Sequence, residues 1–478
     1  MFKGVLYYQE VCMLEFLPLE NNLNILKRYL PYEKSGFCEL SLGVKHAWRK
    51  VICTKYAVVD NTLILKESSP VYKNTFYYPL GENVNNALLE IENYCIQKGL
   101  PLLYCCLDQE QLSFLKNRYP NVQSYYDRDW SDYIYLAESF KTYSGKKLSG
   151  QRNHVNKFKK TYPTGKFKLA TEKDIPRLIE FTEKLNAQTQ FSSWTAKVEA
   201  QSIVDFLQNA FKLDQLIGYV EVDDDIVAFS MGERVNDYLI VHVEKALKEY
   251  QGAYPFVASE FAKAFATDGV KYINREEDCG DLGLRTSKTQ YHPLLIKEKF
   301  YLKAFSPIDY INPDICLTAG DLTITAIKEQ DKQDYYNLYV DEKLNELWGY
   351  DYKSDLNGKK PTPEYFYDFQ NSLKEKREEF SFAVRLNGKM IGEIPLYNFD
   401  FFGGGEIGYR FFSEYQGKGY ATISANAVKE YFFTVLNGKK LKTRCYKQNA
   451  KSHALIERLG FKLSRQDQTH FYFEMQIE

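Results

Sequence analysis

Two stretches of this chain repeat one order of elements, and that order limits the folds available to it. In each stretch a hairpin-like turn joins two apolar runs, at residues 222–228 and 386–392. A strand then leads to Glu-Tyr-Gln-Gly, at 249–252 and 414–417, and a helix and a further strand follow. Strand, loop, helix and strand in this order predict a mixed α/β sheet with a loop at a helix N-terminus.

Two breaks divide the 478 residues into units of ordinary domain size. Residues 305–320 contain prolines and glycine with little periodicity, which predicts a linker between domains. A weaker break separates 1–162 from 163–304, and the linker leads into a third unit, 321–478. The two repeated stretches fall in the second and third of these units.

Composition and charge exclude several classes of function. Lys and Arg number 62 and Asp and Glu 63, so no overall field favours nucleic acid or an anionic membrane. The nine cysteines and six histidines show neither a disulfide framework nor zinc-ligand spacing, and we expect no metal. Apolar runs such as 100–107 fall far below the roughly 18 residues of a membrane span. We therefore expect a cytoplasmic protein without an integral membrane segment, translated from Met1 or Met13.

A short run, Gln-Gly-Lys-Gly-Tyr-Ala at 416–421, lies where a predicted strand ends and a helix begins. Glycine lets the backbone approach a ligand closely and adopts positive φ without strain. Successive N–H groups at a helix N-terminus favour an anion such as a pyrophosphate. The run therefore predicts an anion-binding loop, and the alternative is an ordinary glycine turn that caps a helix.

This run resembles the (Gln/Arg)-x-x-Gly-x-(Gly/Ala) signature of the GNAT acetyltransferases, which Gln416, Gly419 and Ala421 match. Two further stretches resemble that family: 449–461, similar to its second cofactor motif, and 406–411, similar to its fourth strand. The resemblance covers 321–478 and implies that acetyl-CoA is the donor substrate. It implies CoA contacts at Phe411, Phe412, Gln416, Gly417, Lys418, Gly419, Tyr420, Ala421, Asn449 and Ser452.

The chemistry of acetyl transfer singles out a few further residues. An amine attacks a thioester only when neutral, and free amines are largely protonated near pH 7. The resemblance implies Glu406 as the carboxylate that removes this proton, and the alternative is an exposed charge at a strand edge. Backbone N–H groups of residues 408–412 are expected to polarise the thioester oxygen. Many relatives place a tyrosine acid where this chain has Ile456, so Tyr446, His453 or water are the candidate proton donors.

The acceptor is expected to be a small-molecule or peptide amine. Residues 348–363 lie where relatives build the wall of the acceptor site, and they mix aromatic side chains with Asp351 and Asp355. Carboxylates among aromatic rings suit a cationic amine. The alternative is a solvated loop without a function.

Residues from about 14 to 303 resemble a family related to the C-terminal domain of the phosphatidylglycerol lysyltransferases, through stretches at 148–158, 242–254 and 274–293. That family folds as two tandem GNAT-like units. We therefore expect an α/β (α+β) chain of three consecutive GNAT-like mixed-sheet units, two in the N-terminal tandem unit and one in a separate C-terminal domain. The lysyltransferases take their aminoacyl group from charged tRNA, which implies aminoacyl-tRNA as a second partner.

The N-terminal unit offers two groups of candidate substrate contacts. Residues 141–160 carry seven lysines and arginines without an acid, and a helix face at i, i+4 spacing there could meet tRNA phosphates. Residues 274–278 cluster charges at a strand end, where unpaired charge is costly. A solvated basic helix and a structural ion-pair network are the alternatives. The candidates are Arg152, His154, Asn156, Lys157, Glu244, Arg275, Glu276 and Asp278.

Three functions are open to this sequence. The first is an acyltransferase whose C-terminal domain N-acetylates an amine, beside an aminoacyltransferase-like unit. The second is an aminoacyl-tRNA-dependent aminoacyltransferase acting through the N-terminal unit, and the third is a non-catalytic acetyl-CoA-binding or scaffold protein. Tyr254 and Pro255 stand in the second unit near where Gly419 and Tyr420 stand in the third, so we expect a single CoA site.

Overall fold

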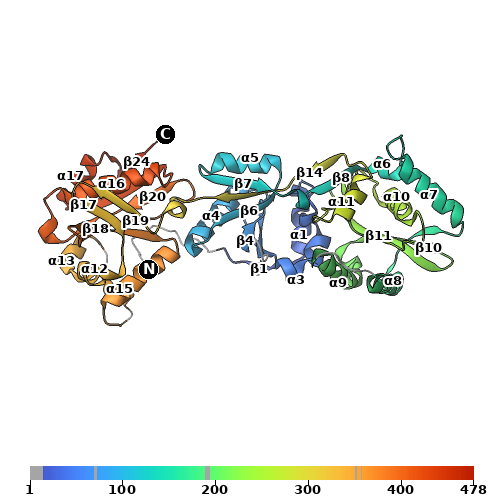
Figure 1. Ribbon diagram of the computed structural model, residues 1–478, viewed down its shortest axis with the longest axis horizontal. Helices are drawn as coiled ribbons and strands as arrows, with labels where there is room; N and C mark the ends of the chain where they lie inside the picture. The colour runs from blue at the N-terminus through green and yellow to red at the C-terminus, as the bar shows by residue number, and fades with distance from the viewer. Residues whose placement is uncertain (1–13, 69–72, 189–193, 350–351, 357, 478) are drawn as a thin grey trace.

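The computed structural model describes residues 14–68, 73–188, 194–349, 352–356 and 358–477. The chain forms three mixed sheets with helices on their faces, arranged in a row along an elongated molecule (Figure 1). The first sheet lies in the middle of the row, the second at one end and the third at the other. The fold is therefore mixed α/β with three sheets, as the sequence predicts.

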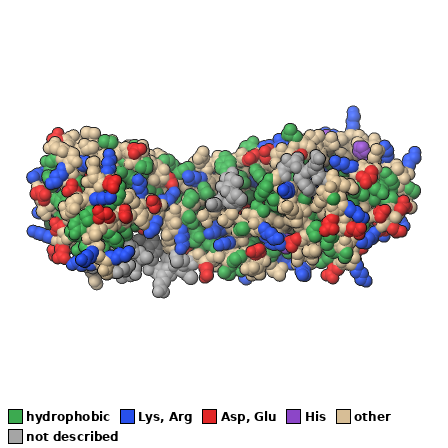
Figure 2. Space-filling model, turned by 60° about the horizontal axis from the view of Figure 1, so that its bottom comes forward, with side chains coloured by type: hydrophobic (Ala, Val, Ile, Leu, Met, Phe, Trp, Pro, Cys, Tyr) green, Lys and Arg blue, Asp and Glu red, His purple; other side chains and the backbone are tan. Residues whose placement is uncertain are grey.

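The surface carries charges of both signs. Acidic and basic side chains intermingle over the face shown in Figure 2. Among the residues that the structure describes, no helix combines the length and the apolar composition needed to cross a bilayer. Met1 and Met13, the two expected starts, lie outside the described residues.

The first sheet has the strand order β1-β2-β3-β4-β6-β15-β7, and β5 pairs with β3. Its core contains Leu88 and Ile91 of one helix and Leu112 and Leu115 of the next. The strands are β1 (Leu17–Pro18), β2 (Lys55–Val59), β3 (Thr62–Ser68), β4 (Lys73–Phe76), β5 (Leu80–Gly81), β6 (Leu102–Leu107), β7 (Val122–Tyr126) and β15 (Phe300–Ala304). The helices are α1 (Asn24–Tyr29), α2 (Leu42–Ala47), α3 (Arg49–Ile52), α4 (Val84–Lys98) and α5 (Gln109–Arg118).

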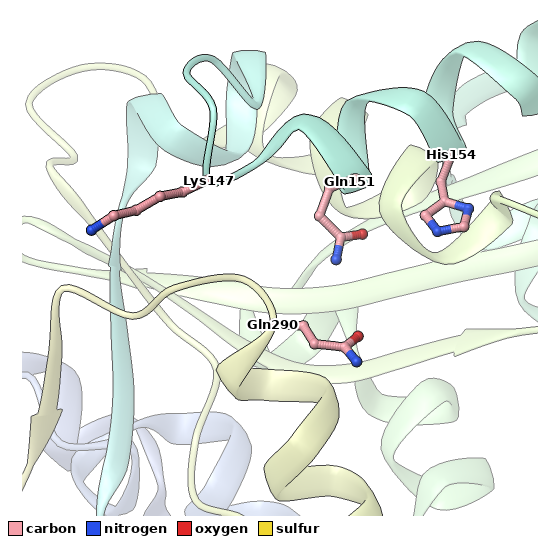
Figure 3. Close-up of a pocket in the computed structure, with 5 residues that line it drawn as sticks. Lys147, Gln151, His154 and Gln290 are labelled. Atoms are coloured by element: carbon pink, nitrogen blue, oxygen red, sulfur yellow. The ribbon is translucent and has the colours of Figure 1, made fainter.

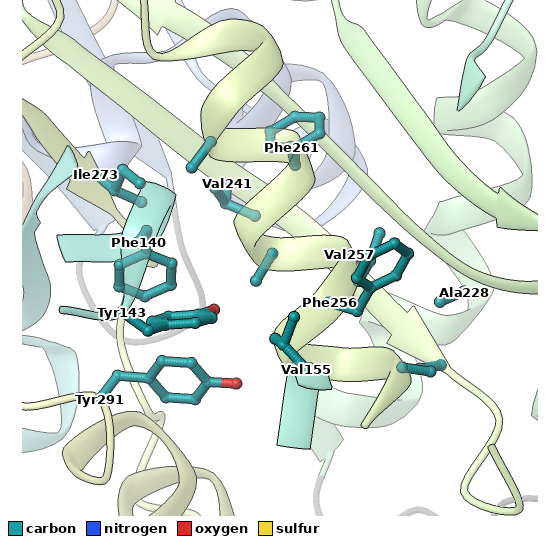
Figure 4. Packing of buried hydrophobic residues seen from close by; sticks show 14 of the residues in the cluster. Phe140, Tyr143, Val155, Ala228, Val241, Phe256, Val257, Phe261, Ile273 and Tyr291 are labelled. Atoms are coloured by element: carbon teal, nitrogen blue, oxygen red, sulfur yellow. The ribbon is translucent and has the colours of Figure 1, made fainter. Parts of the chain in front are cut away.

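The second sheet has the order β14-β8-β13-β12-β11-β10-β9. Phe256, Val257 and Phe261 of one helix lie at the centre of its largest core, and Val155 of a neighbouring helix packs beside them (Figure 4). The strands are β8 (Asp132–Leu136), β9 (Lys166–Leu169), β10 (Leu216–Val222), β11 (Asp225–Val235), β12 (Tyr238–Ala246), β13 (Tyr272–Asn274) and β14 (Leu295–Lys297). The helices are α6 (Ala137–Thr142), α7 (Ser149–Thr161), α8 (Ile175–Gln188), α9 (Trp194–Asn209), α10 (Ala253–Phe265) and α11 (Leu282–Thr289).

The first two sheets exchange strands, so the division expected at residue 162 does not coincide with the strand arrangement. β8 precedes that division but pairs with β13 and β14 in the second sheet. β15 follows the second sheet in sequence but lies between β6 and β7 of the first, with Leu302 and Ala304 buried. Strand periodicity fixes which face of a strand is buried and does not specify its partner, so the sequence did not reveal this exchange.

The third sheet has the order β16-β17-β18-β19-β20-β22-β24-β23, and β21 pairs with β19. β16 lies within the expected linker 305–320 and pairs with β17, so this sheet begins before residue 321. The strands are β16 (Cys316–Ala319), β17 (Leu322–Ala326), β18 (Glu379–Leu386), β19 (Lys389–Tyr397), β20 (Gly404–Ile407), β21 (Arg410–Phe411), β22 (Lys440–Tyr446), β23 (Lys462–Gln466) and β24 (His470–Gln476). The helices are α12 (Lys332–Val340), α13 (Glu342–Glu346), α14 (Tyr352–Asp355), α15 (Pro363–Glu375), α16 (Tyr420–Thr434) and α17 (Ala450–Arg458).

The second and third sheets share the repeat that the sequence shows. Both predicted hairpins form, and each turn uses two residues with positive φ, as type I′ turns require. In each sheet one pair of strands is parallel, β12 with β13 and β20 with β22. The helix between each parallel pair follows a glycine with positive φ, Gly252 before α10 and Gly419 before α16.

A buried ammonium joins the first two sheets. Lys299 lies between β14 and β15, and its Nζ is 2.6 Å from Glu39 Oε1, 2.6 Å from Asp132 Oδ1 and 3.5 Å from Glu277 Oε2. Burial raises the pKa of Glu39 to about 7, against the attraction of Lys299. Cys38, Glu39 and Glu277 lie close enough together to hold a metal ion, but the Lys299 ammonium, 3.5 Å from Cys38 Sγ, is already among them.

We expect Lys299→Met to lower the free energy of unfolding by about 3–5 kcal/mol, because it leaves buried carboxylates without their counter-charge. The loss should be larger at pH 8 than at pH 5, since protonation of the carboxyls relieves their repulsion. Urea denaturation at both pH values measures the free energy of unfolding. Lys303→Met, on the adjacent strand β15, is the matched control, and an equal loss there would contradict this account.

Candidate functional site

The candidate site lies where two parallel strands of the third sheet, β20 and β22, diverge. β20 and β22 pair from Gly404 with Lys440 to Glu406 with Lys442. Beyond that point the Thr443 hydroxyl donates to the carbonyl oxygen of Ile407 at 2.9 Å, and β21 pairs with β19 alone. Because the two strands diverge, backbone groups at the ends of β20 and β22 do not pair with each other as they would in a continuous ladder.

The predicted anion-binding loop lies beside this divergence, at the N-terminus of α16. Gly417 has φ 74° and Gly419 has φ 83°, and a Cβ atom added at either would meet open space. Gln416 is fixed by its Nε2, which donates to the carbonyl oxygen of Phe411 at 3.0 Å. The N-cap residue of α16 is Gly419, which has no side chain to cap the helix, and the first N–H groups lack helical partners as at any helix start. The loop therefore presents free N–H groups and the positive end of a helix dipole.

The other predicted CoA contacts lie in β21 and the turn after it, in the loop and the first turn of α16, and at the start of α17. Asn449 caps α17, with its Oδ1 accepting from the N–H of Ser452 at 3.1 Å. The Ser452 hydroxyl is 2.6 Å from the Tyr409 hydroxyl, which the sequence analysis had not singled out. Phe411 is buried in the core, and Lys418 lies over the ring of Tyr415, 5.5 Å from its centroid. The remaining residues are Phe412, which precedes the short turn into the loop, and Tyr420 and Ala421, the first two residues of α16.

Glu406 lies in the middle of the sheet rather than at a strand edge, which contradicts the alternative interpretation of this residue. It belongs to β20, between β19 and β22, and its side chain is 13% exposed. Both carboxylate oxygens accept hydrogen bonds: Oε1 from the Tyr397 hydroxyl at 3.0 Å, Oε2 from Asn398 Nδ2 at 2.9 Å. Arg444 Nε lies 3.6 Å from Oε1. The carboxylate is thus held in one position at the point where the strands part.

The candidate proton donors occupy different environments. Ile456 is fully buried in the apolar core, so a proton donor at its position would lie inside the core. Tyr446 ends β22, and its hydroxyl lies 2.5 Å from the position that a Cβ at Gly349 would occupy. Its ring also packs on His470, with ring centroids 4.1 Å apart. His453 packs edge-on against the rings of Phe471 and Phe473, with Nδ1 3.7 Å from Glu457 Oε2.

The backbone donors expected at 408–412 are partly used within the sheet. The Gly408 N–H donates to the Pro395 carbonyl oxygen at 3.0 Å, and the Phe412 N–H donates to the Ile391 carbonyl oxygen at 3.1 Å. Between these two residues, Arg410 and Phe411 also pair with β19 in the ladder.

Beside Glu406, one face of the sheet carries charged side chains that the sequence analysis missed. Arg410 donates through Nη1 to Asn345 Oδ1 at 2.8 Å and through Nε to Glu393 Oε1 at 2.8 Å. Glu379 is fully buried, and burial together with the nearby Glu393 raises its pKa to about 8. Side chains alternate between the two faces of a strand, so the sequences of β18 and β19 could have placed these charged residues on the same face as Tyr397 and Glu406.

Trp348 covers this face where the strands diverge. A Cβ added at Gly408 would lie 2.7 Å from the Trp348 indole, and Arg410 lies over the indole at 5.0 Å. Within the described part of the chain the buried indole N–H finds no hydrogen-bond partner. The expected acceptor wall thus begins at Trp348, whereas Asp351 and the side chain of Asp355 lie outside the described residues.

In the second unit the corresponding helix N-terminus is covered by α7. A Cβ added at Gly252 would collide with the carbonyl oxygen of His154 on that helix. Lys157 Nζ donates to Gln251 Oε1 at 2.6 Å, and the ring of Phe158 stacks on Phe256, with centroids 4.7 Å apart. The two loops therefore differ by more than the bulky residues Tyr254 and Pro255, because a whole helix also lies over the loop of the second unit.

Predicted substrate contacts in the second unit are paired with other protein groups. Arg275 Nη2 donates to Glu244 Oε1 at 2.7 Å, inside the domain, and burial raises the pKa of Glu244. Glu276 lies 2.7 Å from His242 Nδ1, and Glu233 lies 2.9 Å from its Nε2. Burial opposes protonation of His242, but the hydrogen bonds to these two carboxylates raise its pKa to about 9.

Asp278 forms a separate ion-pair network at the end of the same segment. It is fully buried and accepts from Arg285 Nε at 2.9 Å, from the Tyr133 hydroxyl at 2.6 Å and from Arg128 Nη1 at 3.1 Å. Burial acts against the charged form, but these donors lower the pKa of Asp278 to about 2. Asp278 therefore holds the segment before α11 in place.

The remaining candidates lie on α7. Arg152 donates to the carbonyl oxygens of Tyr143 and Gly145, which anchors the start of the helix, and Asn156 is exposed. His154 and Gln151 face Gln290 across a surface pocket of about 310 Å³, and Lys147 extends away from them (Figure 3). Among the predicted substrate contacts, His154 is the one that lines this pocket.

Comparisons with known proteins match two different families, one over the first two sheets and one over the third. The family described as phosphatidylglycerol lysyltransferase, C-terminal, matches residues 34–303, and the acetyltransferase (GNAT) domain matches 321–462. An uncharacterized protein of Mycoplasmoides gallisepticum is 25% identical over 286 residues, 59% of this chain and 87% of that protein. The uncharacterized N-acetyltransferase YnaD of Bacillus subtilis is 32% identical over 120 residues, 24% of this chain and 71% of that protein.

One similar solved structure is a conserved protein of unknown function from Bacteroides thetaiotaomicron. It is 28% identical, has a TM-score of 0.55 and covers 61% of this chain and 99% of its own. The family match from 34 to 303 spans more than half of the chain, and the GNAT match begins after it. The chain therefore belongs to the phosphatidylglycerol lysyltransferase C-terminal family and carries a GNAT acetyltransferase domain behind it.

Proposed function

We propose that the GNAT domain transfers the acetyl group of acetyl-CoA to an amine-bearing acceptor. The observation that carries the proposal is the open loop at the N-terminus of α16, with Gly417 and Gly419 at positive φ and space in front of both. A pyrophosphate suits free N–H groups at the positive end of a helix dipole. In this proposal the rest of the donor runs from the loop towards the point where β20 and β22 diverge.

Each residue of the site has a separate role in this proposal. Acetyl-CoA supplies the acetyl group as a thioester. Glu406 takes the proton of the ammonium, so that the neutral nitrogen forms a bond to the acetyl carbon while the carbon–sulfur bond breaks. The departing thiolate takes a proton from Tyr446 or from water, and the second proton, which the nitrogen loses on forming the amide, replaces it. Trp348 lies over the strand divergence and excludes water from one side of it.

The acceptor is best described as a cationic amine. Glu406 shares one face of the sheet with Glu393, which is paired with Arg410, and with Glu379, whose pKa of about 8 leaves it largely protonated near pH 7. A carboxylate beside the reaction centre favours an ammonium over a neutral or anionic group.

We expect the wild-type chain to bind one acetyl-CoA, and Gly419→Glu to weaken that binding by about 100-fold or more, because the new carboxylate opposes the pyrophosphate. Calorimetric titration of the full chain measures affinity and stoichiometry. Gly419→Ala is the matched control, since it strains the same positive φ without adding charge. Equal losses in both variants would assign the effect to the backbone. Residual tight binding in Gly419→Glu would reveal another site and contradict the covering role of α7.

We expect Glu406→Gln to lower kcat by about 10²–10⁴-fold, as the loss of a general base does, while the affinity for acetyl-CoA stays unchanged. Release of the CoA thiol from acetyl-CoA, with benzylamine, lysine and diaminobutane as acceptors, measures turnover. Glu474→Gln, which removes a carboxylate from β24 of the same sheet, should leave kcat unaltered. Unchanged turnover in Glu406→Gln would exclude Glu406 as the base, whereas acetyl-CoA binding by a wild-type chain that shows no turnover would favour a binding or scaffold role.

A second candidate function is aminoacyl transfer from charged tRNA by the N-terminal unit. Its support is the family match over 34–303 together with exposed lysines on α7, among them Lys159 and Lys160. Lysines on one exposed helix can neutralise phosphates, and each neutralised phosphate adds salt dependence.

For this candidate we expect the triple variant Lys157→Glu, Lys159→Glu and Lys160→Glu to lose tRNA retention at low salt, by at least about ten-fold. Filter binding across a salt series measures both the affinity and the salt slope.

A control variant with the same change in net charge separates a local contact from a general field. Lys55, Lys98 and Lys116 are exposed on the first unit, and reversing all three should leave retention nearly unchanged. Equal losses in both triple variants would exclude α7 as a specific tRNA contact.

A further inference from the structure

A loop of the GNAT domain inserts into the first unit of the chain. We name residues 398–403, between β19 and β20, the docking loop. Phe399 belongs to the core of the third sheet, whereas Phe401, two residues later, belongs to the core of the first sheet and is 2% exposed. Successive apolar side chains of one short loop are therefore held in the cores of two different units.

The surface that receives the docking loop is itself rigid. Phe402 lies against the ring of Tyr119, with centroids 5.8 Å apart, and under the guanidinium of Arg118 at 5.4 Å. Arg118 is fixed by a bidentate pair with Glu92, at 2.7 and 3.1 Å. Asn121 Nδ2 adds a hydrogen bond to the carbonyl oxygen of Asn437 at 3.1 Å. The contact thus combines a buried aromatic anchor with fixed polar neighbours, as strong interfaces do.

The docking loop contacts Glu406 at its start, and at its end it continues into the strand that carries Glu406. At its start, Asn398 has φ 51° and donates from Nδ2 to Glu406 Oε2 at 2.9 Å, next to Tyr397, whose hydroxyl donates to Oε1. At its end, Asp400 Oδ1 accepts from the N–H of Gly404, the first residue of β20, at 2.7 Å. Glu406 follows two residues later in the same strand.

We propose that the first unit positions the Glu406 carboxylate through the docking loop, with Asn398 as a positioning residue. This inference rests on the proposed role of Glu406 as the base. Because Phe399 and Phe401 are held in separate cores, the path of the loop between them is fixed, and with it the direction of the Asn398 amide. A base must lie within hydrogen-bond reach of its proton, and a displacement of about 1 Å can cost about 100-fold in rate.

The test uses Phe401→Ala in the full chain, with Leu88→Ala as the matched control. Leu88 is fully buried in the same core but lies on α4, outside the docking loop. We expect Phe401→Ala to increase hydrogen–deuterium exchange of 404–407 without changing that of 420–424. We also expect kcat to fall about ten-fold, with the same three amines as acceptors, while the affinity for acetyl-CoA is retained. Leu88→Ala should leave both the exchange of 404–407 and kcat near wild type.

A second variant avoids any cavity in the core. Asn398 is exposed, and Asn398→Gly keeps access to positive φ while removing the amide that donates to Glu406. We expect the same fall in kcat. Combining Asn398→Gly or Phe401→Ala with Glu406→Gln should add no further loss, because residues that act as a unit are not additive.

The outcomes separate the two proposals. Unchanged turnover in Glu406→Gln alone would exclude Glu406 as the base and would therefore also overturn the positioning role. A loss in Glu406→Gln without one in Phe401→Ala and Asn398→Gly would overturn the positioning role and leave the base in place. Equal effects of Leu88→Ala and Phe401→Ala would assign the loss to general destabilisation and likewise overturn it.

Discussion

The return of β15 into the first sheet determines how the three units of this protein are arranged. After completing the second sheet at β14, the chain runs back and pairs with β6 and β7 instead of continuing outward. The first sheet therefore lies between the other two, and the GNAT domain starts from its side (Figure 1). The docking loop and the buried Lys299 both depend on that return, since each joins the first unit to a segment far along the chain.

Local features of the fold could be predicted from the sequence. The two hairpins, the helices after the Glu-Tyr-Gln-Gly segments and the glycine loop at 416–421 all form, because turn residues and periodicity act over a few positions. The position of Glu406 on a strand leading into that loop was predictable for the same reason. Its two hydrogen-bond donors, Tyr397 and Asn398, were not noticed, although they stand at the end of the adjacent strand.

Features that depend on distant contacts could not be predicted. The residues of β8 and β15 do not indicate which sheet each strand joins, because the alternation of apolar and polar side chains defines the buried face of a strand and not its partner strand. Gly252 looks like Gly419 in sequence, and only the packing of α7 separates a covered helix N-terminus from an open one. Phe401 and Phe402 precede glycines and suggest a turn, whereas in the structure they form an interface.

The contact between Lys299 and Glu39 has a consequence for how the protein is made. The two residues are 260 positions apart, and a ribosome adding about 5–20 residues per second needs roughly 10–50 s to synthesise that interval. Until Lys299 is made, Glu39 lacks its ammonium partner, and Asp132, β6 and β7, once synthesised, lack the ammonium and the strand that join them. The first unit therefore stays incomplete until the last residues of the second unit emerge, with the facing edges of β6 and β7 unpaired in the meantime.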